Sequence, residues 1–102
     1  MKKLYVIAFL LTFLTGPAFG QIMKGHIYDQ ETNEPLAGVN ITYKRLSGET
    51  DGTVSNADGF YQISLPEGGV DLLFSYIGYE NEMVPVVINR NETKTRDIRM
   101  RI

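Results

Sequence analysis

An all-β fold, a seven-stranded antiparallel β-sandwich that follows a cleaved signal peptide, is the fold class that this sequence predicts. After residue 20, apolar residues recur at every second position in short runs, as in strands with one buried face. Clusters of Gly, Pro, Asn and Asp separate these runs, as they separate the strands of a sandwich. No part of this region has the apolar spacing of an amphipathic helix.

The first twenty residues have the organisation of a secretory signal peptide. Lys2 and Lys3 make the start basic, and an almost unbroken apolar run covers residues 4–14. Small residues then lead to a cleavage site expected between Gly20 and Gln21. The run is short for a membrane span, which disfavours the alternative of a retained anchor helix. We therefore expect residues 1–20 to be a signal peptide and residues 21–102 to form one exported domain.

Composition excludes several classes of function. Without Lys2 and Lys3, 8 of the 10 basic residues remain against 12 acidic residues, a formal charge of about −4. No basic stripe is present to attract a phosphate backbone, so nucleic acid is not an expected partner. The chain has no Cys, hence neither disulfides nor a thiolate nucleophile, and its stability must come from packing. An exported domain without disulfides favours a periplasmic location.

Four strands are expected in the first part of the domain, at residues 23–28, 39–44, 53–55 and 61–65. The tight turn at 56–59 separates the last two, and Gly59 accepts the positive φ that closes it. The side chains expected to face inward are Met23, Gly25 and Ile27 on the first strand, Val39, Ile41 and Tyr43 on the second, and Tyr61, Ile63 and Leu65 on the fourth.

Three further strands are expected at residues 70–76, 82–88 and 93–102. The turn between the fifth and sixth strands contains Gly78, where we expect a side chain to clash. Because Pro85 has no amide donor, the sixth strand should lie at a sheet edge or contain a bulge. The inward side chains are expected to be Val70, Leu72, Phe74 and Tyr76, then Val84, Val86 and Ile88, then Ile98, Met100 and Ile102.

The order of these elements resembles the carboxypeptidase-regulatory-like domain, a transthyretin-like β-sandwich. The resemblance runs over about residues 23–100, through KGHIYDQETNEPLAGVNI, SNADGFYQISLPEGG and LLFSYIGYENEMVPVVI. Its most specific parts are Gly25-x-Ile27-x-Asp29, Pro35-Leu36-x-Gly38-Val39, Asp58-Gly59-x-Tyr61 and Ser75-Tyr76-Ile77-Gly78-Tyr79.

In one branch of this family the domain is the periplasmic N-terminal extension of TonB-dependent outer-membrane receptors of the glycan-importer type, and FSYIGYE resembles that branch most. The resemblance implies a non-enzymatic accessory or interaction module in the periplasm, at the inner face of the outer membrane. Its partner would be a receptor plug or barrel, or a TonB-like protein. The printed sequence ends at Ile102, which leaves three alternatives: a stand-alone domain, a truncated receptor, or a fragment of a longer reading frame.

Candidate chemistry is sparse, and we expect no catalytic, cofactor or metal site. His26 is the single histidine, whereas a catalytic zinc needs several ligands around an open position. Because side chains alternate along a strand, we expect His26 on the outer surface of the first strand, opposite to the face of Gly25 and Ile27. A hydrolase of the transthyretin-like type is a remote alternative. Asp51, Asn56 and Asp58 offer oxygen atoms to calcium, but turn formation explains Asn56 and Asp58.

An interaction surface is expected on the outer faces and edges of the sandwich. Phe60, Leu73 and Pro85 would form an apolar patch if contiguous, and Tyr79 joins them as a possible contact residue. The alternative function is a secreted stand-alone module that binds glycan or protein, with Tyr61, Tyr79 or another exposed aromatic ring stacking on a sugar. Tyr76 could serve the same purpose, although its alternation with Leu72 and Phe74 favours burial.

Overall fold

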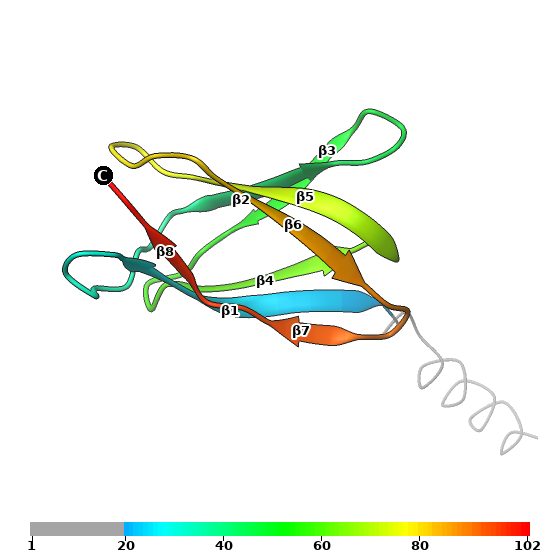
Figure 1. Cartoon of the computed structure of the whole chain (residues 1–102), viewed down its shortest axis with the longest axis horizontal. Coiled ribbons are helices and arrows are strands. Elements are labelled where there is room, and N and C mark those ends of the chain that lie inside the picture. The colour runs from blue at the N-terminus through cyan, green and yellow to red at the C-terminus, as the bar shows by residue number, and fades with distance from the viewer. Residues whose placement is uncertain (1–19) are drawn as a thin grey trace, which may run out of the picture.

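The computed structural model describes residues 20–102, which form two facing β-sheets (Figure 1). Apart from Gly20, the predicted signal peptide lies outside the described residues. The strands are β1 (Gln21–Asp29), β2 (Asn40–Lys44), β3 (Thr50–Val54), β4 (Phe60–Leu65), β5 (Gly68–Ser75), β6 (Glu82–Ile88), β7 (Thr93–Thr95) and β8 (Ile98–Met100). One sheet has the order β4-β1-β7, with β8 also paired to β1, and the other has the order β3-β2-β5-β6. The expected β-sandwich is confirmed.

The last expected strand differs from the prediction. It is interrupted after Thr95, and its two parts, β7 and β8, pair parallel with β1. Residues 20–102 therefore form eight strands, and one of their two sheets is mixed. At the interruption the backbone of Arg96 approaches β1 closely: its N–H donates to the Lys24 carbonyl over 2.8 Å, and its oxygen lies 2.0 Å from where a Cβ on Gly25 would stand. The Asp97 carboxylate then accepts the His26 N–H at 2.9 Å. Where the strand is interrupted, the Asp97 side chain thus takes the place of a backbone carbonyl as the acceptor for the His26 backbone N–H.

The edge position predicted for the strand that contains Pro85 is confirmed. Strand β6 is the last strand of its sheet and pairs with β5 alone within the described part of the chain. Because proline lacks an N–H, it interrupts the row of donors that an edge strand otherwise presents to other chains.

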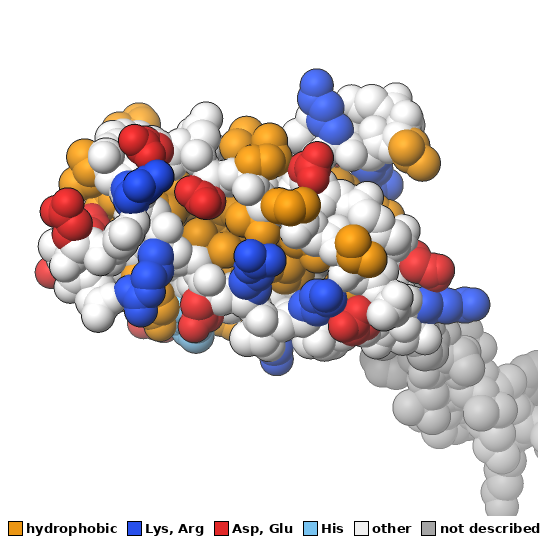
Figure 2. Space-filling view, in the orientation of Figure 1, with side chains coloured by type: hydrophobic (Ala, Val, Ile, Leu, Met, Phe, Trp, Pro, Cys, Tyr) orange, Lys and Arg blue, Asp and Glu red, His pale blue; other side chains and the backbone are white. Residues whose placement is uncertain are grey.

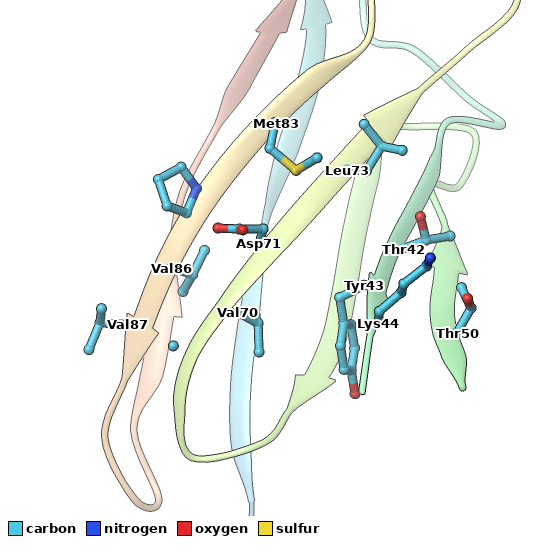
Figure 3. A pocket seen from close by; sticks show the side chains of 12 residues that line it. Thr42, Tyr43, Lys44, Thr50, Val70, Asp71, Leu73, Met83, Val86 and Val87 are labelled. Carbon is cyan, nitrogen blue, oxygen red and sulfur yellow. The ribbon is translucent and has the colours of Figure 1, made fainter. Parts of the chain in front are cut away.

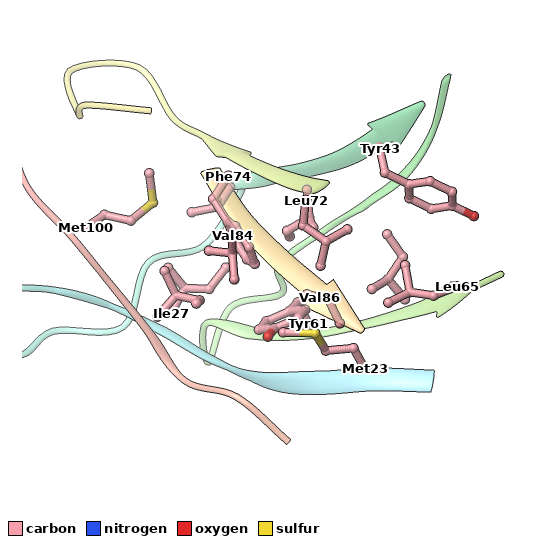
Figure 4. Close-up of a cluster of buried hydrophobic side chains, with 14 of the residues drawn as sticks. Met23, Ile27, Tyr43, Tyr61, Leu65, Leu72, Phe74, Val84, Val86 and Met100 are labelled. Carbon is pink, nitrogen blue, oxygen red and sulfur yellow. The ribbon is translucent and has the colours of Figure 1, made fainter. Parts of the chain in front are cut away.

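The hydrophobic core lies between the two sheets (Figure 4). The inward faces predicted for β1, β2 and β4 are confirmed, and Tyr61 packs edge-to-face on Phe74 with ring centroids 5.4 Å apart. Three strand ends differ from the prediction. Val70 and Tyr76, at the two ends of the expected fifth strand, are only partly buried against the core, and Ile102 is 78% exposed because β8 ends at Met100.

The turn at residues 76–79 requires glycine for a reason other than the one predicted. Gly78 has φ +86°, and a Cβ built on it meets no atom within 4 Å. The expected clash is therefore wrong, and the left-handed backbone explains this glycine.

Candidate interaction surface

A buried carboxylate connects two of the sequence motifs that lie far apart in the chain. Asp29 is 5% exposed, and its Oδ1 accepts the backbone N–H groups of Glu31 at 2.7 Å and Thr32 at 3.0 Å. The Tyr79 hydroxyl donates to Asp29 Oδ2 over 2.5 Å. Sequence reasoning missed this pair, because alternation within strands does not orient a side chain in a turn.

The same contact changes the protonation of both partners. The hydrogen bond from Tyr79, together with those from the Thr32 and Glu31 amides, holds the pKa of Asp29 below its ordinary value. The adjacent carboxylate and burial raise the pKa of Tyr79 to about 12. Tyr79 also packs on Tyr76, with ring centroids 5.6 Å apart. Tyr79 therefore stabilises the fold through its hydroxyl, and its role as a contact residue stays a prediction.

Two of the three tyrosines named for sugar stacking, Tyr61 and Tyr79, make hydrogen bonds within the domain. Tyr61 is 1% exposed and its hydroxyl donates to the Arg96 carbonyl at 2.6 Å, and burial raises its pKa. The expectation that Tyr61 is an exposed aromatic ring is wrong, because it points inward from β4. Tyr79 is tied to Asp29 as described above.

The candidate ligand residues are dispersed. The His26 ring lies on the outer face of β1, edge-on to Phe60 at 5.4 Å and stacked along Tyr28 at 6.1 Å. The Asn56 Oδ1 accepts the N–H groups of Asp58 and Phe60, each at 3.0 Å, which is the turn-forming role predicted for it. Across residues 20–102, no group of three His, Cys, Asp or Glu side chains is placed to hold a metal ion.

The predicted apolar patch is divided between opposite sides of the molecule. Phe60 lies on the outer face of β4, whereas Leu73 and Pro85 lie on the outer faces of β5 and β6 in the other sheet. The proposed face that joins Phe60 and Leu73 is therefore wrong. Alternation within a strand shows that a residue faces outward, but it does not show to which sheet the strand belongs.

Leu73 and Pro85 instead belong to a groove on the outer face of the second sheet, which we call the β5–β6 groove and define by Leu73, Met83, Pro85 and Val87. Leu73 lies opposite Met83 in the ladder, and the 57% exposed Met83 and the 67% exposed Val87 project on the same face of β6. Side chains of β2 and β3, including Lys44, line its far side, and the open volume is about 850 Å³ (Figure 3).

Sequence reasoning missed Met83 and Val87, although the signal was present. Residues 83–88 read MVPVVI, an uninterrupted apolar run. Such runs are typical of strands that are covered on both faces. Figure 2 shows hydrophobic side chains gathered in the middle of one face of the molecule, with charged side chains of both signs around them.

Comparison with known proteins identifies the domain. The family model of the CarboxypepD_reg-like domain matches residues 23–101. The chain belongs to this family. The four motifs that carry the resemblance therefore lie within the matched CarboxypepD_reg-like domain.

Two curated relatives are TonB-dependent receptors. The domain is 34% identical over 93 residues to the TonB-dependent receptor SusC of Bacteroides thetaiotaomicron, covering 89% of this chain and 9% of the receptor. It is 43% identical over 56 residues to the TonB-dependent receptor P39 of Formosa agariphila, covering 55% of this chain and 5% of the receptor. The chain thus spans less than a tenth of the length of either relative.

The solved structures show the fold alone. The 3-chlorocatechol 1,2-dioxygenase of Rhodococcus opacus superimposes with a TM-score of 0.63 over 81% of this chain and 60% of that chain, at 10% sequence identity. At this identity the likeness carries information on the sandwich fold alone. Among residues 20–102, no helix is long and apolar enough to cross a membrane.

Proposed function

We propose that this CarboxypepD_reg-like domain is a non-enzymatic interaction module of a TonB-dependent uptake receptor, located on the periplasmic side of the outer membrane. The partner is a protein of the cell envelope, either the receptor plug or the periplasmic domain of a TonB-like protein. The receptor relationship of SusC and P39 supports this context. Docking takes place on the β5–β6 groove.

The observation that carries the proposal is that β6 is apolar on both faces while it lies at a sheet edge. Its inner residues Val84, Val86 and Ile88 are at most 5% exposed, and its outer residues Met83 and Val87 are more than half exposed. Moving an aliphatic side chain of this size from full exposure to full burial contributes about 1.5–3 kcal/mol, and covering the partly exposed Met83 and Val87 contributes a part of that for each. A strand with this composition is therefore suited to having its outer face covered by another protein.

The arrangement of polar groups supports a role without catalysis. A hydrolase needs a positioned base, a nucleophile and an oxyanion site around one reacting atom. His26 packs between Tyr28 and Phe60, and the Asp29 carboxylate already accepts three hydrogen bonds within the fold. Both groups thus have structural partners.

Site-specific photo-crosslinking tests the proposal. A photoreactive benzoylphenylalanine replaces Val87 in the groove, and a matched control carries it at Gln62, an exposed residue on the outer face of β4. Each purified chain of residues 21–102, which includes every strand of both sheets, is irradiated with the receptor plug or with the TonB-like periplasmic domain of the same bacterium. We expect adducts from position 87 and none from position 62. Equal labelling from both positions, or none at high micromolar concentration, would contradict the proposal.

A further inference from the structure

The β5–β6 groove contains one acidic side chain among its apolar residues. Asp71 lies on β5 directly opposite Pro85, and Leu73 projects on the same face two residues further along the strand. In Figure 3 the Asp71 carboxylate points toward β6. The carboxylate is thus placed where a segment lying in the groove would cover it.

None of the ion pairs of the described region involves this carboxylate. Lys44 lines the same groove, but the pairing of β2 with β5 ends at Thr42 and Leu73, and Lys44 points toward Thr42 in Figure 3. The ion pairs among residues 20–102 are Arg45–Asp51 and Arg101–Glu80, neither of which involves Asp71.

Covering the groove with an entirely apolar segment would remove Asp71 from water without supplying a counter-charge. An isolated buried carboxylate is strongly destabilising, whereas one that pairs with a cation in good geometry is tolerated. The same side chain therefore rejects purely apolar partners and accepts partners that bring a cation.

We infer that the β5–β6 groove binds a protein segment with a Lys or Arg between apolar residues, whose cation pairs with Asp71 while its apolar side chains cover Leu73, Met83 and Val87. This inference rests on the proposed function and specifies the chemistry of the partner. Charge complementarity carries it: Asp71 is the acidic residue of the groove, and the mature domain has 12 acidic residues against 8 basic ones after removal of Lys2 and Lys3.

A random 12-residue peptide library displayed on phage tests this chemistry directly, because it samples apolar, acidic and basic segments alike. The bait is the purified chain of residues 21–102, either unchanged, as Asp71→Lys, or as Asp58→Lys, a control with the same change of charge at an exposed turn. The unchanged chain and the Asp58→Lys variant should both enrich peptides with Lys or Arg between apolar residues. Asp71→Lys should enrich Asp or Glu at that position.

Affinity measurements then locate the peptide. A selected peptide should bind the Asp71→Asn variant about 30-fold more weakly or worse, because its cation would be covered without a partner. It should not bind Val87→Lys, which places a charge in the groove. Enrichment of wholly apolar peptides, no enrichment, or the same preference with Asp71→Lys would overturn the inference. A cross-link from position 87 together with any of these results would leave the proposed function standing and remove only the inferred partner chemistry.

Discussion

Replacing Gly25 with Ala is expected to destabilise the domain severely, although the change adds a single methyl group. A Cβ on residue 25 would lie 2.0 Å from the Arg96 oxygen and 2.6 Å from the Arg96 carbonyl carbon. Both atoms belong to backbone, so the clash cannot be relieved by a side-chain rotation. The segment between β7 and β8 must therefore move away from β1.

The size of the expected loss of stability follows from the contacts that this movement breaks. Overpacking a buried site costs about 1–3 kcal/mol. The displaced Arg96 carbonyl is also the acceptor of the buried Tyr61 hydroxyl, and leaving such a group unpaired costs about 1–3 kcal/mol more. We expect a loss of about 2–6 kcal/mol in the free energy of unfolding. For a domain of this size, that lowers the melting temperature by about 10 °C or more.

Urea unfolding followed by circular dichroism measures this loss, with Gly69→Ala as the matched control. Gly69 is also a strand residue, but its nearest contact would be the Val86 oxygen at 3.9 Å, which is ordinary van der Waals distance. The control should change the free energy of unfolding by less than about 1 kcal/mol. A Gly25→Ala variant as stable as Gly69→Ala would refute the close approach of β1 to Arg96 and the explanation of the interrupted strand.

Three further predictions concern other parts of the scaffold. The buried Ser55 Oγ accepts the Val39 N–H at 2.9 Å and donates to the Leu36 carbonyl at 2.7 Å. Ser55→Ala should therefore lower the free energy of unfolding, measured by urea titration, by about 2–4 kcal/mol. A change below about 0.5 kcal/mol would contradict the role of these two hydrogen bonds. The pKa of Asp29 is lowered in the folded chain, so its contribution to stability is present above the ordinary pKa of about 3.9 and is lost as the pH falls through the folded value. The difference in melting temperature between the unchanged chain and Asp29→Asn should therefore shrink below about pH 4, and a constant difference from pH 7 to pH 2 would count against the role of this carboxylate. Gly78→Ala should lower the free energy of unfolding by about 1–2 kcal/mol because residue 78 has a positive φ, and Gly78→Asn should lower it less. If thermal unfolding shows Asn to be the more destabilising residue, a steric clash rather than the positive φ explains this glycine.

The strands were predictable where a single rule, the two-residue alternation, decides the structure. It identified the inner faces of β1, β2 and β4, and Pro85 placed β6 at an edge. It failed at Arg96, where the strand is interrupted because its backbone approaches Gly25, a residue about seventy positions earlier. Such an interruption depends on a long-range pairing that no local pattern contains.

The candidate site was predictable only in part. Leu73 and Pro85 were correctly predicted to face outward. The sequence pattern does not show which strands share a sheet, so Phe60, which lies in the other sheet, was wrongly assigned to the same patch. The hydrogen bond between Tyr79 and Asp29 joins residues that lie fifty positions apart in the sequence. Met83 and Val87 could have been found from the uninterrupted apolar run, had it been read as a strand covered on both faces.

The motif residues and the groove residues belong to different parts of the molecule, and this separation limits what the family match means. Gly25, Asp29 and Tyr79 hold the strands and turns of the sandwich together through a close backbone approach and a buried hydrogen bond. The β5–β6 groove and Asp71 share no residue with the four motifs. Changes in the motifs should therefore alter stability, whereas changes in the groove should alter binding while the fold is retained. Under the proposed function, two members of this family with the same motifs are expected to bind different partners when the chemistry of their grooves differs.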